Sequence, residues 1–333
     1  MRRPAVSRLP IAVVLGVTGL IVEPIAWLQL ILFGRRLRRL TLPRDPVVVI
    51  GHWRSGTTFL HQLLACDPSA ATARNRLTMA PQVALLLKPW IRWFLPSLMT
   101  SIRPIDNVPW GADDPQEDEV GLARLTIETN MAGLAFPRLY RRCFRDFVLN
   151  QSAEFEQHLL DFARLTWFED GAGKGHLLIK NSAHSARIPL LLRLFPGVRF
   201  IVLKRKPRDS IRSLVQVKQN LAALVGLQNL PDEVTQVKET FYSYMELMQA
   251  FEASRHLIPN GQLAELTYED LCDSPLESLE RIYEELGLTS WEAACHPIAQ
   301  RIQQAGSYQP RPVMLQESSE NVLNALLETE RSL

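Results

Sequence analysis

The sequence predicts an α/β protein with three layers, helix–sheet–helix, built around a central parallel sheet. Short apolar runs at 47–50, 176–180, 199–203 and 262–267 alternate with longer helical patterns. This alternation is typical of parallel strands that helices cover on both faces. Between the first two runs lies a long stretch, 75–167, whose pattern is helical but repeatedly interrupted by proline. We therefore expect a large helical insertion that forms a cap beside the carboxyl edge of the sheet, where ligands of such sheets bind.

Composition limits the function classes. The chain has 333 residues, of which 47% are hydrophobic and 22% charged, as in ordinary globular proteins. The net charge of +2 provides no argument for a nucleic-acid partner. The four cysteines are scattered, with no C-x-x-C pair, which predicts a reducing cytoplasmic location and no structural metal. Nothing in the sequence indicates an oligomeric state.

The N-terminal segment, 1–40, differs from the rest of the chain in composition. Residues 11–33 are strongly apolar and are flanked by Arg2, Arg3 and Arg8 before and by Arg35, Arg36, Arg38 and Arg39 after. About 20 apolar residues suffice to cross a bilayer, but Glu23 and Pro24 fall near the middle. We favour two short apolar helices that lie on the catalytic domain or at a membrane surface, with a membrane span as the alternative. No secretory cleavage signal follows.

The remaining elements are predicted in order along the chain. Strand 47–50 leads into a loop and a helix at 58–65 that ends at Asp67-Pro68. In the insertion, helix 152–168 places Phe155, Leu159, Phe162 and Leu165 on one face. The later strands are followed by helices at 185–195, 209–221, 232–256 and 275–286, the last stopped by Gly287.

The loop after the first strand has the layout of a phosphate-binding loop. Residues 47–58 read VVVIGHWRSGTT, with Gly51 and Gly56 at the spacing G-x-x-x-x-G. The lysine that normally follows the second glycine is replaced by Thr57, and Arg54 lies inside the loop instead. This pattern predicts a P-loop type of fold that holds phosphate without the usual magnesium-bound triphosphate.

Several donors in this loop suit an anion. The amides of residues 53–58 lie at a helix N-terminus, where unpaired N–H groups and the helix dipole attract negative charge. The hydroxyls of Ser55, Thr57 and Thr58 add donors, and the Arg54 guanidinium matches phosphate oxygens. The alternative is a strand-to-helix turn that binds no ligand.

The ends of the other strands are cationic. Strand 176–180 ends in Lys180, and six cationic residues lie between Arg199 and Arg212. A magnesium-dependent nucleotide enzyme usually has an aspartate at such a strand end. The cations therefore predict a second anion site and no metal site, with a solvated basic helix start as the alternative.

The combination of motifs resembles the sulfotransferases that use 3′-phosphoadenosine 5′-phosphosulfate (PAPS), most closely the bacterial branch with a GHWRSGTT loop, similar to tyrosylprotein and carbohydrate sulfotransferases. The resemblance runs from about Pro46 to Leu288, and its anchors are 51–64, 106–119, 178–213 and 266–271. It implies a single sulfotransferase domain at 41–310 with an acceptor cap at about 68–170, followed by a tail at 311–333. PAPS would be the co-substrate, adenosine 3′,5′-bisphosphate the product, and no metal would be required.

The resemblance also implies roles for individual residues. Arg54, Ser55, Gly56, Thr57 and Thr58 would wrap the 5′-phosphosulfate. Lys180 would stabilise charge as the sulfuryl group leaves. Arg205 and Ser213 match the pair that binds the 3′-phosphate, and Tyr268 matches an aromatic position near the nucleotide. Two positions depart from the family: Lys206 replaces an aspartate, and 181–183 read Asn-Ser-Ala where relatives tend to have Ser-Pro-Pro.

The acceptor hydroxyl needs a base to take its proton. The acidic run 113–119 begins a helix in the cap, where acids are also ordinary dipole-complementing residues. Related enzymes with a loop arginine use a cap glutamate, so Glu117 is the first candidate and Glu119 the second. His184 and His61 are weaker candidates, because a lone histidine is more often structural.

The aromatic residues of the cap and the apolar segment at 11–33 bear on the class of acceptor. Aromatic residues of the cap could line an apolar pocket, although such residues more often belong to the core: Trp90, Trp93, Phe94, Trp110 and Phe136. If the apolar segment at 11–33 contacts a membrane surface, we expect a hydrophobic or lipid-like hydroxyl acceptor and a cytoplasmic protein that is peripheral or anchored at the membrane. The alternatives are a P-loop small-molecule kinase and a non-catalytic nucleotide-binding protein associated with a membrane.

Overall fold

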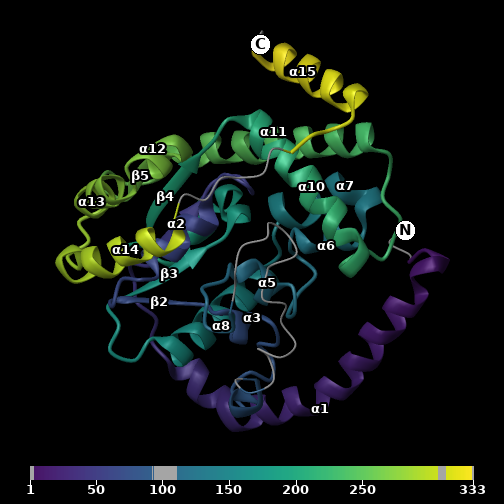
Figure 1. Cartoon of the computed structure of the whole chain (residues 1–333). Coiled ribbons are helices and arrows are strands. Elements are labelled where there is room, and N and C mark those ends of the chain that lie inside the picture. The colour runs from purple at the N-terminus through teal and green to yellow at the C-terminus, as the bar shows by residue number, and fades with distance from the viewer. Residues whose placement is uncertain (1–3, 92, 94–110, 307–312, 332–333) are drawn as a thin grey trace.

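The computed structural model describes residues 4–91, 93, 111–306 and 313–331. Its centre is a five-stranded parallel sheet in the order β2-β3-β1-β4-β5 (Figure 1). The strands are β1 (Val47–Ile50), β2 (Ala70–Thr72), β3 (His176–Lys180), β4 (Arg199–Lys204) and β5 (Leu263–Thr267). Register pairs Val49 of β1 with Lys180 on one side and with Ile201 on the other. The loop after β1 therefore emerges in the middle of the carboxyl edge.

Helices cover both faces of the sheet, which confirms the predicted three-layer fold. Alternate side chains of each strand, such as Val48 and Ile50, pack with α8 (Ala153–Asp170), α9 (Ile188–Leu194) and α11 (Glu233–Arg255). The opposite set, including Val47 and Val49, packs with α2 (Thr57–Leu64), α12 (Tyr268–Asp273), α13 (Pro275–Glu285) and α14 (Trp291–Ala305). Strands β1, β2 and β3 are buried throughout and β4 is buried except at its two ends, as expected when a parallel sheet is covered on both sides, whereas only alternate residues of the edge strand β5 are buried.

Strand β2 was not expected from the sequence. Ala70, Ala71 and Thr72 show neither a β-branched run nor alternation. They become a strand because they lie beside β3 with parallel register, from Ala70 opposite His176 to Thr72 opposite Leu178. Tertiary pairing thus overrides weak local propensity at the edge of the sheet.

The insertion after β2 is helical, as predicted, but most of its helices are short. They are α3 (Asn75–Thr78), α5 (Asp118–Leu122), α6 (Met131–Ala135), α7 (Tyr140–Phe144) and the long α8. Ser152 caps α8, since its hydroxyl accepts a hydrogen bond from the Phe155 amide. The predicted helix 185–195 divides into a 3-10 turn, η4 (Ser182–Ala186), and α9, because Pro189 has no amide hydrogen and favours the first turn of a new helix.

The N-terminal segment corrects a prediction. In place of two short helices, a single helix, α1 (Leu9–Arg39), continues through Pro24. A proline removes one intrahelical hydrogen bond and bends the helix, and the apolar residues on both sides continue the helical path. The helix curves around the body of the protein, as Figure 1 shows. By length and composition it is the one candidate membrane-crossing helix of the described residues.

Two further helices complete the molecule. Helix α10 (Pro207–Val225) begins directly after β4 and packs on α11. Helix α15 (Glu317–Arg331), in the predicted C-terminal tail, packs across α11 at the top of Figure 1. Its Leu323 is fully buried against Ile211, Val215 and Val237.

Candidate active site

The loop after β1 has a backbone that requires glycine at two positions. Gly51 has φ of +128°, and a Cβ there would lie 2.4 Å from the Leu203 carbonyl oxygen. Gly56 has φ of +98°, and its Cβ would lie 2.6 Å from a ring carbon of Tyr268. Arg54, at φ of +68°, is the one non-glycine residue with positive φ in the described chain. Such backbone positions are costly and occur mainly at functional sites.

The loop ends at the N-terminus of α2, which presents unpaired amides. The first α-helical hydrogen bond runs from the Leu60 amide to the Gly56 carbonyl oxygen. The amides of Thr57 and Thr58 precede it and therefore have no intrahelical acceptor. The Ser55 hydroxyl differs from the expectation: it donates to the His52 carbonyl oxygen at 2.7 Å. Its proton thus supports the loop and is not directed at a ligand.

The structure brings together four predicted donor-binding residues that are far apart in the sequence. Arg54 Nε donates to Ser213 Oγ at 3.0 Å. Arg205 Nη1 donates to the Arg54 carbonyl oxygen at 2.9 Å, and its guanidinium lies 4.2 Å from the centre of the Tyr268 ring. The side chains come from the β1–α2 loop, the end of β4, α10 and the start of α12. They form one cationic cluster at the carboxyl edge of the sheet.

Most of the neighbouring cations are neutralised. Lys204 pairs with Glu265, Lys206 with Glu269, and both Arg208 and Arg212 with Glu320 of α15. Arg205 differs from them. Across the described residues it has no carboxylate partner, and its buried Nε has no hydrogen-bond acceptor.

A buried donor of this kind can be satisfied by an acceptor from outside the chain. The cluster around Arg205 therefore fits a phosphate group, which would supply that acceptor.

Lys180 and Glu117 form an ion pair beside the loop. Lys180 ends β3, and its Nζ contacts Glu117 Oε2. The Asn181 amide donates to the Val49 carbonyl oxygen at 3.1 Å, which places Lys180 next to the end of β1. Glu117 is the N-cap residue of α5, so a residue of the cap is held directly against the sheet edge.

Glu119, two residues further, lies in a different environment. It is 0% exposed. Its carboxylate accepts from the Asn130 amide at 2.5 Å and from Asn181 Nδ2 at 2.7 Å. Arg187 Nη1 lies 3.6 Å away. Burial raises the pKa of Glu119 above its ordinary value, against the opposing effect of Arg187 and these hydrogen bonds.

His184 is also enclosed. It has no exposed surface, and its Nε2 lies 3.2 Å from Asp118 Oδ2. Its Nδ1 faces Arg187 Nη1 at 3.4 Å. Arg187 is itself fully buried, donates to the Phe147 carbonyl oxygen at 3.1 Å and stacks 4.2 Å from the Phe155 ring centre.

Three consecutive acids are thus held by the last residue of β3 and the segment that follows it. Glu117 pairs with Lys180, Asp118 with His184, and Glu119 with Asn181 and Arg187. Sequence reasoning did not assign roles to Asp118, Asn181 or Arg187. The available signal was the placement of polar residues at 180, 181, 184 and 187 immediately after a buried strand.

Two further histidines near the loop are buried and structural. His61 Nε2 lies 2.8 Å from Thr72 Oγ1, and burial with nearby Lys180 and Arg74 lowers its pKa to about 3. His52 lies against the Tyr244 ring, and burial lowers its pKa to about 3 as well. Both rings are therefore neutral at physiological pH.

The cap aromatics do not form an enclosed apolar pocket within the described residues. Trp90 and Trp93 are exposed, whereas Phe136 packs against a small core cluster that includes Cys143. Phe94 and Trp110 lie outside the described residues. The lining of an acceptor pocket by these side chains stays a prediction.

Known proteins resemble this chain over most of its length. The model of the Sulfotransferase family matches residues 46–293. Two curated relatives, from Mycobacterium bovis and Mycobacterium tuberculosis, are omega-hydroxy-beta-dihydromenaquinone-9 sulfotransferases named Stf3. Each is 29% identical over 297 residues, which cover 86% of this chain and 74% of the relative.

Solved structures share the fold. Sulfotransferase STF9 from Mycobacterium avium superposes with a TM-score of 0.66 at 17% identity, covering 89% of this chain and 79% of that one. Sulfotransferase STF1 from Mycobacterium tuberculosis superposes with a TM-score of 0.61 at 15% identity, covering 97% of this chain and 88% of that one. The family match spans the loop after β1, the cap, the cationic cluster and β5. This chain therefore belongs to the sulfotransferase family and is a sulfotransferase enzyme.

Proposed function

We propose that this enzyme transfers the sulfuryl group of PAPS to the hydroxyl of a hydrophobic acceptor. The observation that carries the proposal is the cluster of Arg54, Arg205, Ser213 and Tyr268 beside the Lys180–Glu117 pair. A donor with two separate phosphate groups needs two anion sites. The N-terminus of α2 and the Arg205 guanidinium, which contacts the same loop at Arg54, would supply them.

The donor's parts are assigned by the chemistry of the residues. The 3′-phosphate would accept hydrogen bonds from Arg205 and Ser213, and the orphaned Arg205 Nε supports this role. The adenine would lie near Tyr268. The 5′-phosphosulfate would face the amides of Thr57 and Thr58, with Gly56 allowing close approach and Ser55 bracing the loop. Arg54, now hydrogen-bonded to Ser213, would reach both phosphates.

The transfer step requires charge stabilisation and a base. The acceptor oxygen forms a bond to sulfur while the bond from sulfur to the bridging 5′-phosphate oxygen breaks. Negative charge develops on that leaving oxygen, where Lys180 and Arg54 stabilise it. The hydroxyl proton passes to a carboxylate in hydrogen-bond reach. Adenosine 3′,5′-bisphosphate and the sulfate ester are the products.

Glu117 is the best candidate for the base. Its carboxylate is partly exposed and touches Lys180, the residue assigned to the leaving group. Glu119 and His184 have no exposed surface, and each is already engaged by buried partners. We therefore assign Glu119 and His184 to support of the site, although both were candidates on sequence grounds.

The acceptor class is inferred from two observations. The curated relatives are named for sulfation of a hydroxylated menaquinone, a long apolar molecule. In this chain, α1 exposes many apolar side chains close to the cap. A hydrophobic or lipid-like alcohol as the acceptor is consistent with both observations.

Calorimetry and a transfer assay test the proposal together. Without added metal, adenosine 3′,5′-bisphosphate should bind at least tenfold more tightly than ATP. With PAPS present, the enzyme should sulfate long-chain alcohols in preference to soluble sugars. Equal or tighter binding of ATP, or activity that is lost on chelation of magnesium, would point to a kinase. Tight binding without transfer to any alcohol would point to a non-catalytic protein, and transfer only to soluble sugars would reject the hydrophobic acceptor.

A further inference from the structure

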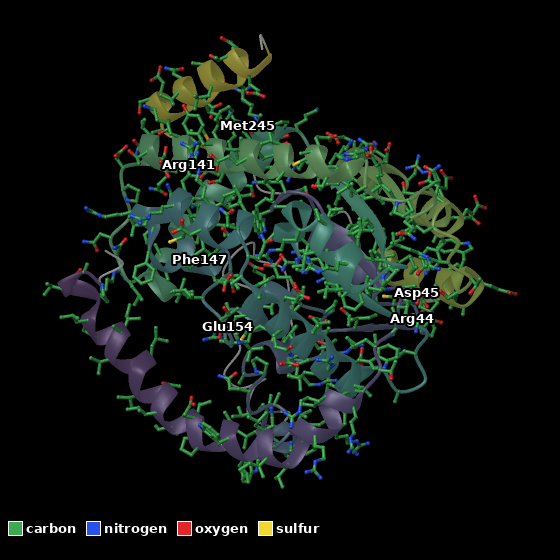
Figure 2. The ribbon with its side chains drawn as sticks, turned by 180° about the vertical axis from the view of Figure 1, so that it is seen from behind. Arg44, Asp45, Arg141, Phe147, Glu154 and Met245 are labelled. Carbon is green, nitrogen blue, oxygen red and sulfur yellow. The ribbon has the colours of Figure 1, made fainter. Side chains whose placement is uncertain are left out.

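Helix α1 exposes an apolar surface along most of its length. Leu20 is 76% exposed and Ile31 is 72% exposed. Other large apolar side chains are also exposed over several turns: Val13, Val14, Leu15, Val17, Ile21, Trp27, Leu28, Leu30 and Leu32. Figure 2, seen from behind, shows α1 as an arc around the body, with side chains projecting from it. An exposed apolar surface of this size marks an interaction site.

Both ends of this helix are attached to the same domain. At the N-terminal end, the Ala5 amide donates to the Leu227 carbonyl oxygen at 2.8 Å, and Ser7 Oγ lies 3.4 Å from Asn229 Oδ1. Leu227 is in turn bonded to α6, because its amide donates to the Ala135 carbonyl oxygen at 2.7 Å.

The C-terminal half is attached through a buried glutamine. Gln29 Nε2 donates to the Pro81 carbonyl oxygen at 2.9 Å, and its Oε1 accepts from the Leu85 amide at 2.8 Å. Beyond it, Phe33 meets the edge of the Phe168 ring, and Leu37 packs on the main core. A buried amide that satisfies backbone groups of another segment fixes both position and rotation of a helix.

These two attachments are inconsistent with a helix that crosses a bilayer. Ser7 and Gln29 are separated by roughly 33 Å along a helix that rises 1.5 Å per residue. This length is close to the thickness of the hydrocarbon core, about 30 Å. If α1 crossed a membrane, its two attachment points would lie on opposite sides, yet one domain holds both.

The charges and aromatic residues indicate a lipid surface as the partner. Arg35, Arg36, Arg38 and Arg39 follow the apolar stretch and are exposed, which suits anionic headgroups. Trp27, Trp90 and Trp93 are exposed as well, and tryptophan favours the membrane–water boundary. An interfacial helix usually turns a polar face to water. In α1 the C-terminal part turns one face to the protein, through Gln29, Gly34 and Leu37, whereas residues 13–21 are exposed on all sides and apolar except for Thr18 and the two glycines.

We propose that α1 lies flat in one leaflet of an anionic membrane, and that the enzyme is monotopic. The outer side of the arc enters the lipid while both ends stay attached to the domain. Resting on the proposed function, this geometry holds the cap beside the bilayer, so that a membrane-dissolved alcohol reaches the Lys180–Glu117 pair without passing through water.

Vesicle binding by the full-length chain tests the surface without donor or acceptor. The protein should sediment with phosphatidylcholine vesicles that contain 30% phosphatidylglycerol. The variants Leu20→Glu and Ile31→Glu should each lower the partition coefficient at least tenfold, because each places a charge in the lipid. Leu276→Glu, on the exposed side of α13, is the matched control and should bind normally. Replacing Arg35, Arg38 and Arg39 with glutamine should remove most of the dependence on phosphatidylglycerol.

Depth measurements separate a flat helix from a span. Nitroxide labels on Val13→Cys, Leu20→Cys and Leu28→Cys, in a chain with Cys66, Cys272 and Cys295 replaced by serine, report immersion depth. A flat helix gives similar depths at all three positions. A span would put residue 20 roughly 10 Å deeper than a label near either end, since seven residues rise about that far.

Three outcomes would overturn the proposal: no binding to vesicles, binding that Leu20→Glu leaves unchanged, or the depth profile of a span. A concentration-dependent dimer abolished by the same substitutions would identify a second copy as the occupant instead. Transfer to a short soluble alcohol needs no membrane, so failure of this proposal and failure of the sulfotransferase assignment are distinguishable.

Discussion

At the scale of single residues, Glu117 and Glu119 differ by two positions but have different environments. Glu117 is the N-cap of α5 and contacts Lys180 at the sheet edge. Glu119 points inward and is closed in by Asn130, Asn181 and Arg187. Only a carboxylate that an acceptor can reach is able to act as the base, so the difference in exposure makes the two acids experimentally separable.

Glu117→Gln should lower kcat by about 10²–10⁴-fold, because general base catalysis contributes on that order. The dissociation constant of adenosine 3′,5′-bisphosphate, measured by calorimetry, should change little. Asp113→Asn is the matched control, since Asp113 belongs to the same acidic run but is exposed and pairs with Arg76. A kcat for Glu117→Gln within threefold of the natural enzyme would exclude Glu117 as the base.

Arg205→Ala should selectively weaken ligands that carry a 3′-phosphate. Loss of charge-assisted hydrogen bonds of about 1.5–3 kcal/mol corresponds to a roughly 10- to 100-fold higher dissociation constant for adenosine 3′,5′-bisphosphate. Adenosine 5′-phosphate should bind the variant and the natural enzyme alike. Arg208→Ala, which removes a cation already paired with Glu320, is the control. Equal weakening of both ligands would show that Arg205 does not hold the 3′-phosphate.

At the scale of elements, the start of α5 is held to the end of β3 and to η4 by three successive acid contacts. The inner contacts are wholly buried, where a carboxylate and a guanidinium are stable only as partners. These contacts hold the start of α5, and with it Glu117, beside Lys180. The 181–183 segment, which departs from the family pattern, contributes through Asn181, whose side chain caps η4 and binds Glu119.

Arg187→Met should destabilise the protein by about 3–5 kcal/mol, because it leaves the Glu119 carboxylate buried without its cation. Adding Glu119→Gln should restore part of the lost stability, since an amide needs no counter-charge. Urea unfolding of the two single variants and the double variant forms a complete cycle. Strict additivity of the two losses would contradict an energetic coupling between these side chains.

At the scale of the whole molecule, buried neutral histidines make stability depend on pH. The pKa values of His52 and His61 are about 3 in the folded state, mainly because of burial, against about 6.5 in an unfolded chain. At a pH between the folded and unfolded pKa values, these two histidines are protonated in the unfolded chain but neutral in the folded chain. Stability is therefore fully present above pH 6.5 and falls as the pH decreases below it.

As the pH falls from 7 to 5, each of the two histidines should lower the free energy of unfolding by about 2 kcal/mol, because it becomes protonated only in the unfolded chain. The urea midpoint of the natural enzyme should fall over that range. His61→Gln, which can still bond Thr72, should show about half of the loss that these two histidines cause. An equal fall in the variant and the natural enzyme would mean that His61 does not contribute to the pH dependence.

The sequence alone determined the fold class, four of the five strands and the segments that form the candidate anion site. These follow from local signals: apolar runs, glycine spacing and a contiguous loop motif. The tertiary structure decided the rest. It paired β2 with the sheet edge, continued α1 through Pro24, directed the Ser55 hydroxyl to a carbonyl oxygen of its own loop, and paired Lys204, Lys206, Arg208 and Arg212 with carboxylates. It also buried Glu119 while leaving Glu117 accessible. Burial and partner choice depend on residues distant along the chain, and these two properties determine what a charged side chain can do.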